Sequence, residues 1–148
     1  MIELESIRFI EDVKTKQEAL YTFSKMAKEL EYIYSEEEFL EGLLEREEEF
    51  STGIGSKVAV PHCKSNTIKK ASVLVQKFSN DIDWGAIDGE PVKLAICLAV
   101  PEEEAGTTHI KLLSSIARSL INKDFVKKLL NCEDRQELFD NIKSVLTK

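Results

Sequence analysis

The sequence predicts an α/β fold of the mixed α+β kind, in which one central mixed β-sheet is covered by helices on both faces. Apolar residues recur at helical spacing over 19–44, apolar runs rich in β-branched residues occupy 71–78 and 91–100, and helical spacing returns from residue 110 onward. Helices, then strands, then helices again can bury both faces of one sheet. The chain has 148 residues, about the length of one domain, so we expect 1–148 to form a single domain.

Two helices are predicted in the first third of the chain. Thr15 and Glu18 have the spacing of a capping box, in which a hydroxyl caps the helix start and a carboxylate three residues on caps in return. Ser35 and Glu38 repeat this pattern, and we expect the second helix to end near residues 46–49. The apolar residues expected to form the buried faces of the two helices are Ala19, Leu20, Phe23, Met26, Ala27, Leu30, Phe39, Leu40, Leu43 and Leu44.

Strands are predicted in the middle of the chain. The glycine-containing segment 50–56 indicates a turn, and the β-branched run Val58–Val60 indicates a strand end, because Pro61 stops it. Residues 71–78 form a stronger strand candidate. Residues 91–100 are nearly all apolar, which is typical of a central strand buried on both faces.

Three further helices follow these strands. Apolar residues at helical spacing predict one helix over 110–121. Asp124 is expected to cap a short helix over 125–130, and the capping box of Asp134 and Glu137 is expected to open the last one.

Composition and charge exclude several classes of protein. No apolar run approaches the roughly 18 residues of a membrane span, and the acidic first residues do not have the charge pattern of a signal peptide, so we expect a cytoplasmic location. The net charge of −7 argues against nucleic acid as the main partner. Three widely spaced cysteines, Cys63, Cys97 and Cys132, match neither a zinc ribbon nor a disulfide framework, and we expect no metal site.

The two histidines of the chain, His62 and His109, follow predicted strands closely. In open α/β sheets the functional crevice lies outside the carboxyl ends of strands, where both histidines could meet. A neutral imidazole has one ring nitrogen able to attack phosphorus. Arg46 offers a guanidinium suited to phosphate oxygens, and the turn at Thr52, Gly53 and Gly55 offers hydroxyl and N–H donors. These residues together are candidates for a phosphohistidine site.

Several motifs around His62 resemble the phosphorylation-site signature of the fructose/mannitol family of phosphotransferase-system (PTS) IIA proteins. The matching segments are Arg46-Glu, Ser51-Thr-Gly-Ile-Gly55, Val58-Ala-Val-Pro-His62-Cys-Lys-Ser65, Ile82-Asp-Trp84, Leu94-Ala-Ile-Cys-Leu-Ala-Val-Pro101 and Thr108-His-Ile-Lys-Leu-Leu-Ser114. The resemblance is specific over about residues 40–130, and Asp83-Trp84 and Asp88-Gly89 favour its fructose-like branch.

This resemblance implies a function for each part of the candidate site. His62 takes a phosphoryl group from the histidine phosphocarrier protein, by its Nε2 atom, and passes it to a IIB component for sugar uptake. Arg46 is the active-site arginine and His109 the second, non-phosphorylated histidine. No metal or organic cofactor is expected, and contact with the membrane is indirect, through the sugar permease. Ile54, Val58 and Ala59 are candidates for an apolar rim that partners contact.

Two other functions remain open from the sequence. The same His62 is compatible with a nitrogen- or nutrient-regulatory IIA-like module, whose phosphorylation state controls partner binding. A cysteine hydrolase using Cys63 and His109 would require a depressed thiol pKa and an oxyanion hole.

Overall fold

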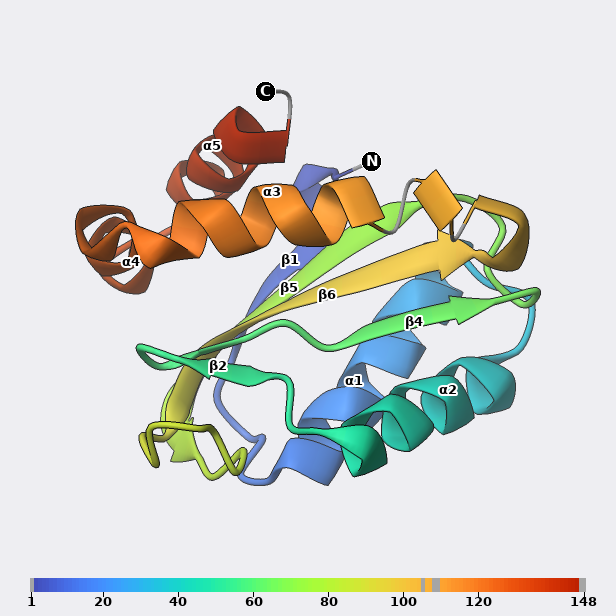
Figure 1. The fold of residues 1–148 in the computed structure, drawn as a ribbon, viewed down its shortest axis with the longest axis horizontal. Coiled ribbons are helices and arrows are strands. Elements are labelled where there is room, and N and C mark those ends of the chain that lie inside the picture. Colours follow the sequence, from blue (N-terminus) through green and yellow to red (C-terminus); the bar gives the residue numbers. More distant parts are fainter. Residues whose placement is uncertain (1, 105, 108–109, 147–148) are drawn as a thin grey trace.

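A six-stranded mixed sheet forms the centre of the molecule, with helices on both of its faces, as the sequence predicts (Figure 1). The computed structural model describes residues 2–104, 106–107 and 110–146. The strands are β1 (Ile7–Ile10), β2 (Gly53–Gly55), β3 (Val58–Ala59), β4 (His62–Ser65), β5 (Ser72–Ile82) and β6 (Val92–Pro101). The sheet order is β1-β5-β6-β3-β2, and β4 also pairs with β6.

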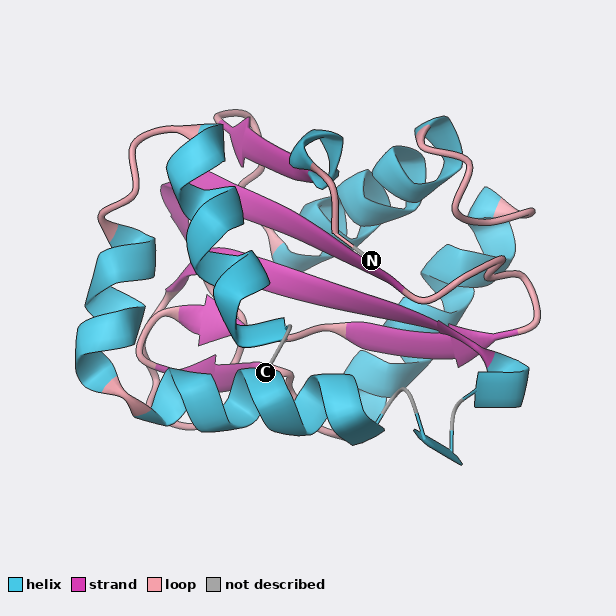
Figure 2. Cartoon of the chain, turned by 90° about the horizontal axis from the view of Figure 1, so that it is seen from above, coloured by secondary structure: helices cyan, strands magenta, loops and turns pink. Residues whose placement is uncertain are grey.

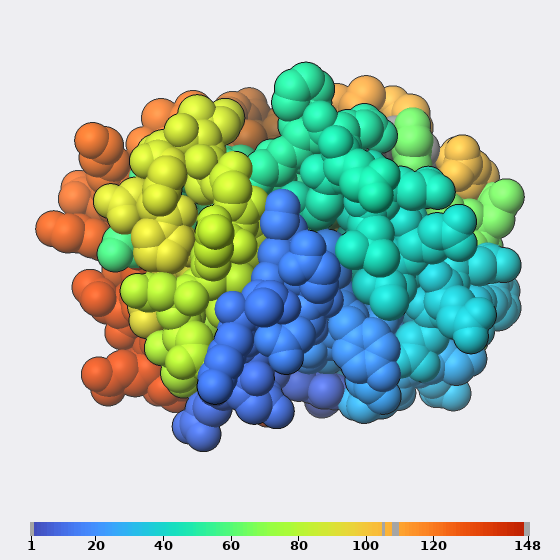
Figure 3. Space-filling view, turned by 90° about the horizontal axis from the view of Figure 1, so that it is seen from below, coloured from blue at the N-terminus to red at the C-terminus, as the bar shows by residue number. Residues whose placement is uncertain are grey.

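The helices divide into two layers. The two helices α1 (Lys16–Glu29) and α2 (Glu36–Glu49) cover one face, which Figure 3 shows from outside. The opposite face carries α3 (Ile110–Ile121), α4 (Lys123–Leu130) and α5 (Arg135–Leu146), seen above the strands in Figure 2. Two short 3₁₀ helices, η1 (Leu4–Ser6) and η2 (Glu102–Glu104), complete the described elements. None of the helices in the described part of the chain is long and apolar enough to cross a bilayer.

Alternating side chains of β5 and β6 fill the two cores. Leu74 and Cys97 pack beneath α1 and α2, whereas Val75 and Ile96 point into the core beneath α3, α4 and α5. Successive side chains of a strand point to opposite faces, so a strand with both faces covered must be apolar throughout. The prediction that 91–100 is a central buried strand is thereby confirmed.

Helix starts follow the capping residues read from the sequence, with one exception. The Thr15–Glu18 capping box is present in both directions. Ser35 accepts from the N–H of Glu38 without the return bond that a capping box requires, so only half of that prediction is confirmed. Asp134 accepts from the N–H of Glu137. The prediction that Asp124 caps α4 is wrong. Asn122 is the N-cap, and its side-chain oxygen accepts from two backbone N–H groups of the first turn.

The two short strands β3 and β4 run along the same side of β6 and parallel to it. Ala59 is opposite Ala95 and His62 is opposite Leu98, so the pair form one strand interrupted at residues 60–61. Pro61 has no N–H, which breaks the hydrogen-bond ladder at that point. The interruption lies directly before His62 and decides which backbone groups surround it.

Candidate active site

His62 is the first residue of β4, on the edge of the sheet next to α2. His62 follows a strand end, as expected, and it also opens the next strand, because the chain resumes its pairing with β6 at this residue. The residue is 9% exposed, and its side chain faces a pocket instead of the bulk solvent.

The hydrogen bonds of His62 define its tautomer. Nδ1 lies 2.9 Å from the carbonyl oxygen of Val60, which is outside the ladder of β3. A carbonyl oxygen only accepts, so Nδ1 carries the proton. Nε2 therefore has the lone pair, and it accepts a hydrogen bond of 3.0 Å from Nε of Arg46. The nitrogen available for attack on phosphorus is Nε2.

Arg46 reaches His62 from the last turn of α2. While Nε donates to His62, Nη1 donates to the carbonyl oxygen of Phe50 at 2.7 Å, so the guanidinium is held at two points. Gly42, one turn earlier on the same face, allows α2 to approach β4 closely, because a Cβ at this position would overlap Sγ of Cys63. Gly42 was not among the predicted site residues, and only the three-dimensional contact shows its role.

A cavity of about 360 Å³ surrounds these two side chains. Its lining residues are Gly42, Glu45, Arg46, Glu49, His62, Cys63 and Lys64. The acidic side chains are at exposed positions, whereas Arg46 is half-buried and directly bonded to the imidazole. A tetrahedral anion on Nε2 would therefore meet the arginine first.

The environment lowers the pKa of His62 below its ordinary value of 6.5. Burial is the largest cause, since it disfavours the charged imidazolium. The hydrogen bond to Val60 O opposes the shift and the positive charge of Arg46 adds to it. The imidazole is therefore neutral at neutral pH, as a nucleophile must be.

The donors predicted in the turn have other partners. The hydroxyl of Thr52 bonds to Glu47, its N–H donates to Glu47 Oε2 at 3.2 Å, and the N–H of Gly53 donates to Ser51 Oγ. Gly55 has a φ of +97°, a conformation that favours glycine, and ends β2 beside Asp88. None of these three residues lines the cavity around His62. Their role in phosphate binding stays a prediction.

His109 lies outside the described residues, so its predicted place beside His62 is untested. Among the candidate residues that the structure describes, Arg46 is the one that lies beside His62.

Cys63 has the environment of a structural thiol. Burial raises its pKa to about 12, the opposite of the shift that a cysteine nucleophile requires. Its Sγ faces Gly42 beneath α2. The cysteine-hydrolase alternative therefore has no chemical support at this residue.

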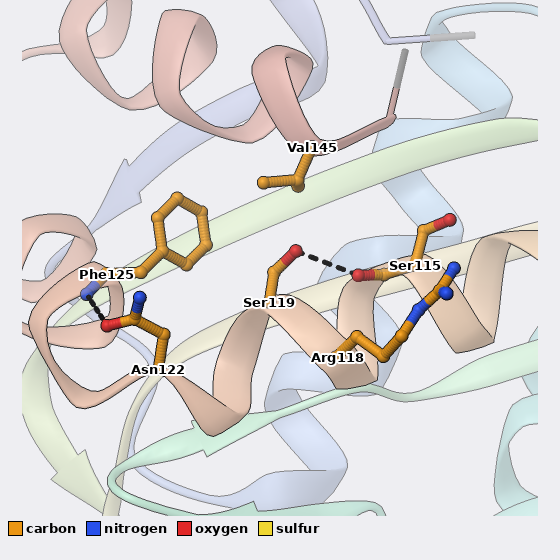
Figure 4. A pocket seen from close by; sticks show the side chains of 6 residues that line it. All are labelled: Ser115, Arg118, Ser119, Asn122, Phe125 and Val145. Atoms are coloured by element: carbon orange, nitrogen blue, oxygen red, sulfur yellow. Dashed lines mark hydrogen bonds between the residues drawn. The ribbon is translucent and has the colours of Figure 1, made fainter. Parts of the chain in front are cut away.

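A second cavity, of about 470 Å³, lies between α3, α4 and α5 (Figure 4). It is lined by Ser115, Arg118, Ser119, Asn122, Phe125 and Val145. Ser119 Oγ donates to the carbonyl of Ser115 within α3, and Asn122 caps α4. Both side chains therefore stabilise helices. Its lining holds no histidine, cysteine or carboxylate, so it offers no counterpart of the His62–Arg46 pair.

The fold and the His62–Arg46 pair define a mixed α/β domain with a histidine-centred site at the edge of its sheet. The family model for the phosphoenolpyruvate-dependent sugar phosphotransferase system, EIIA 2, matches residues 1–145, and the chain belongs to this family. The resemblance found in the sequence is thereby confirmed. Family membership supports a phosphoryl-carrier role in the sugar phosphotransferase system.

Individual relatives agree with this assignment. A fructose-specific EIIA component of Haloferax volcanii is 33% identical over 143 residues, which cover 97% of this chain and 92% of the relative. The nitrogen regulatory protein IIA-Ntr of Neisseria meningitidis has a similar structure, with a TM-score of 0.87, 27% identity and 95% of each chain covered. Mannitol IIA of Escherichia coli, in its complex with phosphorylated IIB, shares the fold at a TM-score of 0.79, with 21% identity and coverage of 97% and 99%.

Proposed function

We propose that this protein accepts a phosphoryl group from the histidine phosphocarrier protein on Nε2 of His62 and passes it to a IIB component of a sugar permease. The observation that carries the proposal is the pair of hydrogen bonds on the imidazole. Nδ1–H donates to Val60 O, and Nε2 accepts from Arg46. The ring is thereby held in the one tautomer that presents Nε2 to the cavity.

The chemistry of transfer follows from this geometry. The Nε2 lone pair forms a bond to phosphorus as the bond from phosphorus to the donor's imidazole breaks, and Nδ1 keeps its proton throughout. The ring gains positive charge as the bond forms, and the hydrogen bond to Val60 O stabilises it. Arg46 must leave Nε2 to admit the phosphorus, and its guanidinium then stabilises the phosphoryl oxygens. His109 is proposed as a second supporting group.

Two exposed apolar side chains that follow Arg46 in the sequence are candidates for contact with a transient partner. Phe50 and Ile54 are exposed, at 79% and 45%, on the segment that follows Arg46. Val58 and Ala59, also expected at this rim, are fully buried, so that expectation is wrong. A carrier must release each partner, and we expect an interface at the small end of the usual range. The cytoplasmic location and the indirect contact with the membrane remain parts of the proposal.

A regulatory role is the second candidate function. Its support is the likeness to IIA-Ntr, which is a nitrogen regulatory protein by name. The fructose-specific name of the Haloferax relative and the IIB complex of mannitol IIA support the transport role. Both roles use the same phosphorylated histidine, so they differ in the protein that receives the signal or the phosphoryl group.

Phosphoryl transfer from phosphoenolpyruvate tests the proposal. Purified enzyme I and phosphocarrier protein would be incubated with the wild type, His62→Ala and His109→Ala. We expect an acid-labile, base-stable phosphate on the wild type and on His109→Ala, and none on His62→Ala. Equal labelling of His62→Ala would show that the assigned residue is wrong. Transfer of the labelled phosphoryl group from His62 to a IIB component would identify the transport role.

A further inference from the structure

Glu47, the residue after Arg46, is a carboxylate enclosed by hydrogen-bond donors. Its side chain is only 6% exposed. Oε2 lies 3.0 Å from Nζ of Lys16 and accepts from the N–H of Thr52 at 3.2 Å. Oε1 accepts from the hydroxyl of Thr52 and from Nε1 of Trp84, the latter at 3.3 Å. The indole also donates to the Thr52 hydroxyl at 3.0 Å.

These contacts join three separate segments of the chain. Lys16 is the first residue of α1, Thr52 lies in the segment between α2 and β2, and Trp84 follows β5. All three converge on the last turn of α2, which carries Glu47 next to Arg46. Enclosing an ion pair costs desolvation free energy that its attraction often fails to recover, so stability alone is a weak reason for this arrangement.

Two paths lead from Glu47 to the reacting groups, and both combine hydrogen bonds with short pieces of backbone. In the first, Glu47 holds Thr52, the carbonyl of Thr52 accepts from Val60 N–H at 2.9 Å, and the carbonyl of Val60 accepts from His62 Nδ1–H. In the second, the segment held at Thr52 includes Phe50, whose carbonyl binds Nη1 of Arg46. The same anchor thus fixes the backbone acceptors of both site side chains.

We infer that Glu47 is a positioning residue for phosphoryl transfer, which, together with Thr52 and Trp84, fixes the carbonyl groups that orient His62 and Arg46. This inference depends on the proposed function, since it assigns a role in that reaction. It gives Thr52 a role in the site through the backbone, without contact to phosphate. Glu47 itself does not line the cavity and touches no reacting atom.

The test is Glu47→Gln, which keeps the size of the side chain and removes its charge. We expect kcat for transfer from the phosphorylated phosphocarrier protein to fall about tenfold, because small displacements of reacting groups are costly, while KM changes little. The matched control is Glu48→Gln, which removes the same charge at the next, exposed position and should leave kcat unchanged. Thermal unfolding establishes that each variant is folded at the assay temperature.

Nuclear magnetic resonance supplies a readout that a purely structural role would not change. Arg46 Nε–H, which donates to His62 and not to Glu47, should exchange with solvent faster in Glu47→Gln. The indole N–H of Trp84 donates to Glu47 directly, so its exchange reports only the loss of that local contact. If Glu47→Gln does not fold, Thr52→Val replaces it, because valine removes only the hydroxyl link. A folded variant with wild-type kcat and wild-type exchange at Arg46 would overturn the inference, as would an equal loss of kcat in Glu48→Gln.

The two proposals fail in different ways. If the wild type accepts no phosphoryl group, the proposed function is wrong, and the inferred role in the reaction is overturned with it. Faster exchange at Arg46 in Glu47→Gln would then show that the anchor orients a site with another chemistry. If the wild type is phosphorylated and Glu47→Gln behaves like it in both assays, only the positioning inference is wrong.

Discussion

A Cβ added to Gly42 would overlap Sγ of Cys63 but would lie 3.7 Å from the Cβ of that residue, an ordinary contact distance. The sulfur atom therefore occupies the space that any larger residue at position 42 would need. Because Gly42 is one turn before Arg46, this contact sets how closely the end of α2 approaches His62.

The first prediction concerns this contact. Gly42→Ala should destabilise the wild type by about 1–3 kcal/mol through overpacking. In a Cys63→Ala background the same substitution should instead stabilise by up to about 1 kcal/mol, since alanine is the better helix former and the sulfur is gone. Urea unfolding of the four proteins in this cycle measures both changes. The same sign in both backgrounds would contradict the contact.

The second prediction concerns the two hydrogen bonds that the guanidinium of Arg46 donates. Arg46→Lys keeps the charge but cannot donate to both His62 and Phe50 in the observed geometry. We expect phosphoryl transfer to slow about 100-fold, the usual scale for loss of a preorganised donor. Rapid-quench kinetics with the phosphocarrier protein give the rate. Arg118→Lys, at an exposed position in the other cavity, is the control and should transfer at the wild-type rate.

The sequence predicts the parts of the fold that have long or well-capped signals. The Thr15 capping box, the apolar run of β6 and the helical spacing of α3 are each strong patterns, and each element forms as predicted. Three strands, β1, β2 and β4, are absent from the prediction. The strand β4 has buried residues only at its first two positions, and β1 has four residues, so neither offers enough alternation to detect. Gly53 and Gly55 indicate a turn, yet they pair irregularly with β3.

The sequence predicts those residues of the candidate site that belong to a recognisable motif. His62 and Arg46 belong to the family signature, and the structure brings them together. Gly42, Glu47 and the carbonyl of Val60 were not predicted, because their roles depend on contacts between α2, β4 and the segment before β2. The acidic run at 45–49 reads as a solvated helix end. Only its contacts show that Glu47 is enclosed while Glu48 is exposed.

The third prediction is that Cys63 is chemically inert in the folded protein. With a pKa raised to about 12, only about 0.01% of this thiol is ionised at pH 8, and the side chain is buried. Iodoacetamide at pH 8 should leave Cys63 unmodified in the native protein and label it rapidly in urea, as peptide mass spectrometry would show. Rapid native labelling with loss of phosphoryl transfer would instead revive a thiol-based mechanism.

The fourth prediction is the pH dependence that His62 gives to stability. Its pKa is lowered in the folded state, so below the unfolded value of about 6.5 the unfolded chain binds more protons than the folded one. The stabilising contribution of the neutral ring is therefore complete above pH 6.5, and it is lost as the pH falls through 6.5 toward the folded value. Below that value the loss is complete and constant.

His62→Gln isolates this contribution, because glutamine does not titrate. We expect the free energy of unfolding to fall further between pH 7.5 and 5 in the wild type than in His62→Gln. Titration of the His62 ring by nuclear magnetic resonance should give a midpoint below 6.5. A midpoint above 6.5, with a smaller loss of stability in the wild type than in His62→Gln, would mean that the folded site favours the imidazolium, which has no lone pair on Nε2 for attack on phosphorus.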